Sequence, residues 1–134
     1  GLPLLKRNVQ LNSGALGDCV SATSVAELKW GREASVQVAP TGCDIVIGCE
    51  VIYQHDDETA AALVETMRHL AGKDGFCLMA YEFRDGLMQD AVFFDAANDV
   101  FEVSAESLAH YGFGLSEDSD DRLLYTYRAK VQES

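Results

Sequence analysis

The sequence has few basic residues and no long apolar run, and each shortage excludes a class of protein. Ten lysines and arginines stand against 22 aspartates and glutamates, so the 134-residue chain has a formal net charge of −12. This balance argues against the broad basic face that nucleic-acid binding needs. No apolar run approaches the ~20 residues that cross a bilayer, and no segment resembles a signal peptide. We therefore expect a soluble cytoplasmic protein without nucleic-acid or membrane partners.

Metal sites and common catalytic signatures are also missing from the sequence. It contains no Cys-x-x-Cys pair, and its three histidines have no acidic or cysteine partner at ligand spacing. Glycine-rich phosphate loops, the zinc-binding His-Glu-x-x-His motif and the serine nucleophile elbow do not occur. The acidic segment 117–121 lacks the ligand spacing of a calcium loop. We expect a metal-free domain.

Hydrophobic periodicity predicts alternating strands and helices. Nearly continuous apolar runs at 44–49 and 76–81 are typical of strands that are covered on both faces. Between them, apolar residues at i, i+3, i+4 and i+7 predict a helix over residues 57–71, capped by Asp56 or Asp57. This alternation predicts an α/β fold with a parallel sheet. Further helices are expected at 2–12 and 87–97, further strands at 24–30, 100–103 and 123–131, and a loop at 31–42.

Charged and aromatic residues gather where the expected strands end. Glu50 and Tyr53 follow the first buried strand, Glu82 follows the second, and Trp30 ends an earlier one. Ligands of an open parallel sheet bind beyond the carboxyl ends of its strands, so we expect these side chains at one rim. Simpler interpretations are a polar loop in which the Tyr53 ring packs, strand-end packing of Trp30, and a surface ion pair between Glu82 and Arg84.

Four segments, in this order, resemble the seven-strand protein-lysine methyltransferases. They are PLLKRNVQLN, SVAELKWG, the stretch from DIVIGCEVIY to RHLAG, and MAYEFR, and the resemblance covers about residues 3–104. The branch they resemble includes the enzymes related to the valosin-containing-protein and Hsp70 lysine methyltransferases. In that branch a Leu-x-Trp pair ends one strand and an acidic-x-x-Tyr motif follows the next. Glu50 stands where aspartate is more usual, and it keeps the negative charge at a longer reach.

The resemblance implies a three-layer Rossmann-like sheet with strand order 3-2-1-4-5-7-6, whose last two strands form an antiparallel edge. The family's first two strands and its glycine-rich turn have no counterpart in this sequence. Residues 1–134 would therefore be the carboxyl-terminal part of a single methyltransferase domain. The strand at 44–49 would then have an open edge, which the segment 24–30, an upstream segment or a second copy of the chain would pair with.

Cofactor, substrate and residue roles follow from the same resemblance. It implies S-adenosylmethionine as cofactor and a protein lysine side chain as substrate. Trp30 would lie against the adenine, the Cys49 backbone would sit beside the cofactor, and Glu50 and Tyr53 would shape the lysine channel, with Glu82 beside it. This chain alone would be inactive and bind the cofactor weakly, because the family's methionine and ribose sites are missing. The alternative is a non-catalytic acidic α/β module that engages a basic partner.

Overall fold

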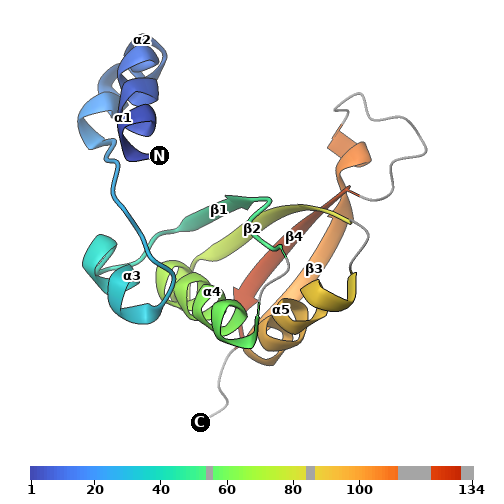
Figure 1. Ribbon diagram of the computed structural model, residues 1–134. Coiled ribbons are helices and arrows are strands. Elements are labelled where there is room, and N and C mark those ends of the chain that lie inside the picture. The colour runs from blue at the N-terminus through green and yellow to red at the C-terminus, as the bar shows by residue number, and fades with distance from the viewer. Residues whose placement is uncertain (54–55, 84–86, 112–121, 131–134) are drawn as a thin grey trace.

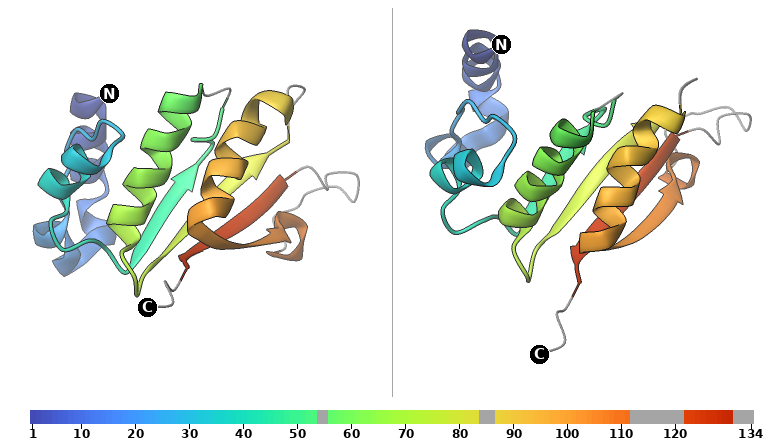
Figure 2. Two further views of the ribbon diagram at one scale, coloured as in Figure 1. Left: turned by 90° about the horizontal axis from the view of Figure 1, so that it is seen from below. Right: turned by 60° about the horizontal axis from the view of Figure 1, so that its bottom comes forward.

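A four-stranded sheet with two long helices on one face forms the main body of the protein (Figure 1). The computed structural model describes residues 1–53, 56–83, 87–111 and 122–130. The two helices are α4 (Asp57–Ala71) and α5 (Leu87–Val100), and they lie side by side across the sheet (Figure 2). The strands are β1 (Ile45–Cys49), β2 (Phe76–Glu82), β3 (Phe101–Ser107) and β4 (Arg122–Ala129).

The strand order in the sheet is β1-β2-β4-β3. The β1–β2 pair is parallel, whereas β4 runs antiparallel to both β2 and β3. The prediction of a parallel sheet is therefore correct for one pair only, and the sheet is mostly antiparallel. The antiparallel last pair is confirmed, and the order equals 4-5-7-6, the order that the resemblance implies for the last four strands. Since β1 and β2 run the same way, both end at the same edge of the sheet.

The segment before β1 differs most from the prediction. It begins with three short helices that bury no residue, and Figure 1 shows them apart from the sheet: α1 (Leu2–Leu11), α2 (Ser13–Leu16) and η1 (Gly17–Ala22). The prediction of a strand at 24–30 is wrong, because this segment pairs with none of the described strands. The loop expected at 31–42 is also wrong, since α3 (Arg32–Val38) forms there and packs on α4.

Helix α4 follows the edge at which β1 ends, and the spacing of its apolar residues predicted it correctly. The Asp56 carboxylate accepts a hydrogen bond from the Thr59 N–H at 2.8 Å and so caps the helix, as expected. Its apolar side packs on the inner face of the sheet, where alternate residues of β2 are buried. The main buried residues of this core are Leu63, Val64, Met67, Cys77, Met79, Tyr81, Phe93, Phe101 and Tyr127. None of the described helices is long and apolar enough to cross a membrane.

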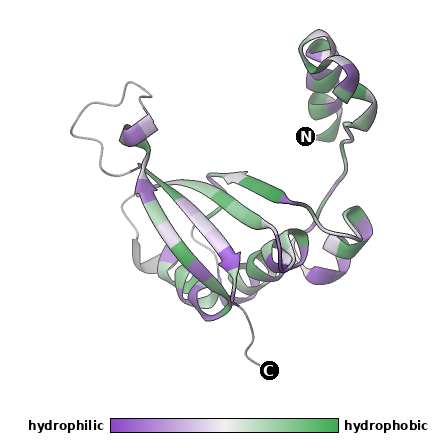
Figure 3. Ribbon diagram, turned by 180° about the vertical axis from the view of Figure 1, so that it is seen from behind, coloured by the Kyte–Doolittle hydropathy of each residue, from purple (hydrophilic) through white to green (hydrophobic). Residues whose placement is uncertain are grey.

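The other face of the sheet is not covered by a helix in the described part of the chain. The β1 side chains on that face are exposed, with Ile45 at 51% and Ile47 at 77%. The hydropathy colouring of Figure 3 shows that β1 is a largely hydrophobic strand. The expectation that β1 is covered on both faces is therefore wrong here, because α4 and α5 both lie on one side. The outer edge of β1 has no described strand beside it. Pairing of this edge with a second copy stays a prediction.

The turn between α4 and β2 generates a stability prediction. A Cβ atom added at Gly75 would lie 2.5 Å from the carbonyl oxygens of Ala71 and Cys43, whereas one added at Gly72 meets nothing within 4 Å. Gly72 does have a positive φ of 59°. Urea denaturation should show that Gly75→Ala lowers the free energy of unfolding by about 3 kcal/mol or more, and Gly72→Ala by about 1–2 kcal/mol. If the two variants lose the same free energy of unfolding, the backbone around Gly75 can move away from the added methyl group.

Candidate functional site

Two of the predicted catalytic residues meet where β1 and β2 end. The Glu50 N–H donates to the Ala80 carbonyl oxygen at 3.1 Å, which extends the β1–β2 pairing beyond the last residue of β1. In return, the Glu50 Oε1 atom accepts a hydrogen bond from the Glu82 N–H at 3.0 Å. A hydrogen bond from a main-chain N–H to a carboxylate is charge-assisted and stronger than a neutral one. Glu50 and Glu82 therefore form one unit at the carboxyl edge, although they are 32 residues apart in sequence.

The backbone of Glu50 is in the left-handed region, with φ at 53°. Glu50 is alone in this among the non-glycine residues that the structure describes. This conformation costs roughly 1–2 kcal/mol for an L-residue with a Cβ atom. Such strain persists where surrounding contacts impose it, and it concentrates at functional sites. Here the two hydrogen bonds of Glu50 to β2 hold it in place, and the turn directs the chain from β1 toward α4.

The side chain of Glu82 forms an ion pair with a residue that the sequence did not single out. Arg122 Nε lies 3.2 Å from Glu82 Oε1, and the two residues face each other in the β2–β4 register. Both side chains are about 40% exposed, so we expect the pair to add little stability. Its effect is to orient Glu82. The alternative partner considered above, Arg84, lies outside the described residues.

The remaining predicted site residues occupy two places. Cys49 is exposed at the end of β1, and Tyr53, which is 52% exposed, follows Glu50 by three residues in the loop toward α4. Trp30 is 37% exposed and precedes Gly31, whose N–H donates to Thr66 Oγ1 at 2.7 Å. Because Thr66 is the tenth residue of α4, the structure anchors the chain next to Trp30 along the middle of that helix and not at the carboxyl edge, where the sequence predicts Trp30.

A buried pair behind this edge was missed. The Tyr81 hydroxyl donates to Asp90 Oδ2 at 2.6 Å, and the two residues are 2% and 6% exposed. Burial, and then the hydrogen bond to Asp90, raise the pKa of the Tyr81 phenol, so it stays protonated and remains a donor at physiological pH. One signal could have found the pair. Neighbouring residues of a strand face opposite sides, so Tyr81 had to point toward the helices if Glu82 points away from them.

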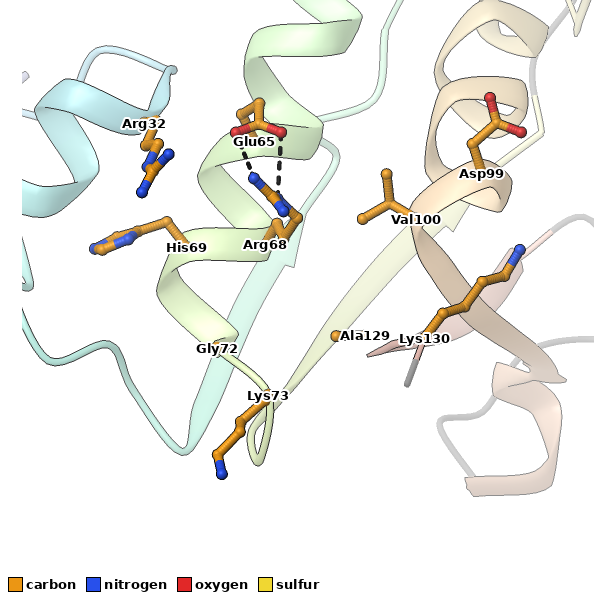
Figure 4. A pocket seen from close by; sticks show the side chains of 10 residues that line it. All are labelled: Arg32, Glu65, Arg68, His69, Gly72, Lys73, Asp99, Val100, Ala129 and Lys130. Carbon is orange, nitrogen blue, oxygen red and sulfur yellow. Dashed lines mark hydrogen bonds and ion pairs between the residues drawn. The ribbon is translucent and has the colours of Figure 1, made fainter. Parts of the chain in front are cut away.

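A cleft of about 650 Å³ lies at the opposite end of α4 and α5, away from the carboxyl edge (Figure 4). It holds several cations, but their contacts are internal to the protein. Arg68 pairs with Glu65 at 3.2 Å, and Lys130 Nζ donates to the Asn98 carbonyl oxygen at 2.6 Å. Cations at helix carboxyl ends balance the helix dipole. In Figure 4, Lys73 and Lys130 point in different directions rather than toward one point, so we assign no ligand to this cleft.

Comparison with known protein families identifies the class of protein to which the chain belongs. A family model described as lysine methyltransferase matches residues 1–100. The match covers most of the 134-residue chain, and the chain belongs to the lysine methyltransferase family. The mixed α/β fold is consistent with a methyltransferase fold. A search of curated proteins found no match. The described residues contain no group of three side chains that could hold a metal ion.

The contact between Glu50 and Glu82 leads to a prediction about the stability of Glu50 variants. Glutamine at position 50 keeps a side-chain oxygen that accepts a hydrogen bond from the Glu82 N–H, whereas alanine does not. The cost of the left-handed backbone is the same in both variants, so it cancels in the comparison. Glu50→Ala should therefore lower the free energy of unfolding by about 1.5–3 kcal/mol, the range for a hydrogen bond to a charged group, and Glu50→Gln, which keeps a neutral hydrogen bond, by about half as much. Chemical denaturation of the two variants measures the difference. If both lose the same amount, the side-chain contact does not hold the edge.

Proposed function

We propose that this chain takes part in the transfer of a methyl group from S-adenosylmethionine to a lysine side chain of a protein. We further propose that it is the carboxyl-terminal part of a methyltransferase domain of the branch related to the valosin-containing-protein and Hsp70 lysine methyltransferases. One observation carries the proposal. At the carboxyl edge of the parallel strand pair, the Glu82 N–H donates to the carboxylate of Glu50, and the family resemblance places Glu50 in the lysine channel and Glu82 beside it. That edge is where ligands of such sheets bind.

The described residues fit one side of a site for S-adenosylmethionine. The cofactor has a positively charged sulfonium and a flat adenine ring, and it supplies the methyl group that is transferred. Trp30 offers a partly exposed ring in the segment before α3, and Cys49 lies exposed at the carboxyl end of β1. Aromatic rings stack on flat groups and attract cations. Trp30 and the backbone at Cys49 would hold the cofactor, and we expect residues outside those described here to complete its pocket.

The acidic edge suits the lysine side of the reaction. A lysine arrives as an ammonium ion, which the carboxylates at this edge attract and orient. The nitrogen must lose its proton before it can attack a methyl group, and a nearby carboxylate or water can accept that proton. Glu50 accepts a hydrogen bond from the Glu82 N–H and Glu82 pairs with Arg122, so each carboxylate has a partner that orients it. Tyr53, half exposed in the loop that follows Glu50, would form a wall of the lysine channel.

The alternative is a non-catalytic module that binds a basic partner through its acidic surface. The net charge of −12 supports it, because charge complementarity steers association with a cationic surface. The two functions differ in their requirements. A binding module needs the overall charge, and replacement of any one exposed carboxylate changes little. A methyltransferase needs Glu50, Tyr53 and Glu82 in particular.

Variants at the edge should separate the two functions. In the complete methyltransferase domain, Glu50→Gln keeps the contact with Glu82 but removes the charge, and Tyr53→Phe removes only the hydroxyl. We expect each to lower kcat for methylation of a lysine-containing protein roughly tenfold or more, as is typical for groups that orient or deprotonate a substrate. The dissociation constant of S-adenosylmethionine should stay within about threefold, because neither residue contacts the cofactor in the proposal.

The control is Glu102→Gln, which removes an exposed carboxylate of β3 that lies outside the proposed site. Its kcat should equal that of the unchanged protein. Trp30→Ala should do the reverse of the edge variants and weaken cofactor binding. If Glu50→Gln, Tyr53→Phe and Glu102→Gln all retain full activity, the lysine does not bind at this edge.

A further inference from the structure

The pair formed by Tyr81 and Asp90 is the one buried carboxylate contact in the described part of the chain. Carboxylates are rarely buried unless they are paired, because burial removes their hydration. Asp90 lies in the first turn of α5, where the positive end of the helix dipole favours a negative charge. Replacement of buried charged pairs by hydrophobic residues of similar volume is often neutral or stabilising. The carboxylate therefore calls for an explanation other than core stability.

The contacts of Tyr81 show what Asp90 fixes. The Tyr81 ring packs edge-on against Phe83 and Phe94, at centroid distances of 5.2 and 5.4 Å. These contacts restrict the ring, and the hydrogen bond to Asp90 Oδ2 fixes the position of the hydroxyl at its far end. The side chain of the penultimate residue of β2 is thus held at both its ring and its tip.

Tyr81 is directly linked to the candidate site through the backbone. Glu82, the next residue, donates its N–H to Glu50 Oε1 and pairs with Arg122 through its side chain. Neighbouring strand residues face opposite sides, so a rotation of β2 at Tyr81 would rotate Glu82 on the other face. Glu50 also lies within electrostatic range of the Tyr81 phenol. A displacement of Tyr81 would therefore move both carboxylates of the edge.

We propose that Asp90 is a positioning residue of the candidate site, which acts through Tyr81 to fix the end of β2 and hence the carboxylates of Glu82 and Glu50. What those carboxylates do rests on the proposed function, whereas the contacts that hold them do not. Asp90 itself is buried and does not touch a substrate.

Hydrogen exchange of the Glu82 amide in the 134-residue chain, followed by NMR, tests this proposal. Tyr81→Phe removes the hydroxyl and keeps the ring, and Asp90→Leu removes the acceptor. Each should speed exchange of the Glu82 amide by about three- to tenfold, the range that corresponds to the loss of one hydrogen bond. Asp90→Asn keeps a side-chain oxygen that can accept from Tyr81 and should restore slow exchange. Amides within β3 should be unaffected in all three variants.

Asp95→Asn is the matched control, because Asp95 is an exposed residue of the same helix. It should leave the Glu82 amide unchanged. Faster exchange of all strand amides together would overturn the proposal, because it would show a general role of the pair in core stability. No change at the Glu82 amide in Tyr81→Phe would also overturn it. The measurement uses neither cofactor nor substrate, so a failure of the proposed function leaves this readout intact.

Discussion

The hydrogen bond from the Glu82 N–H to the Glu50 carboxylate is the contact on which the candidate site depends. It exists because β1 and β2 are parallel and in register, so that both strands end at one edge. Parallel pairing alone would leave the segments that follow β1 and β2 free to diverge after Cys49. The contact holds them together for one more residue, with the backbone of Glu50 in a left-handed conformation. The edge is therefore a fixed arrangement of charge rather than two independent loops.

Each carboxylate of this edge is oriented from a different direction. Glu50 is held by the backbone of β2, and Glu82 by Arg122 of β4. Behind them, Tyr81 is held by Asp90 of α5. Three elements from the second half of the chain thus support a site in which Glu50 directly follows β1. This arrangement suits a reaction that requires mainly the positioning of a lysine nitrogen, because little reorganisation is then needed when the substrate binds.

The sequence predicts the elements whose signal is local and misses those that depend on distant partners. The helix at 57–71 and the strand at 76–81 agree with α4 and β2 because apolar spacing and a capping Asp56 are encoded within each segment. The segment 24–30 has the same alternation as a strand, yet alternation cannot show whether a neighbouring strand exists.

The same reasoning applies to the site. Glu50 and Glu82 follow buried strands, so their common edge could be predicted from sequence. Arg122 is 40 residues from Glu82, and no local pattern connects them. The conformation of Glu50 could not be predicted either, because it results from contacts with β2 and not from a residue type that favours positive φ.

We propose that a lysine side chain binds at the edge formed by Glu50 and Glu82. NMR titration of the 134-residue chain with N-acetyl-lysine methylamide tests this directly, with the norleucine analogue, which lacks the amine, as control. We expect the lysine compound to shift the amide signals of Glu50, Tyr53 and Glu82 most, and the norleucine compound to leave them in place. Equal shifts with both compounds, or lysine-dependent shifts confined to other parts of the chain, would contradict it.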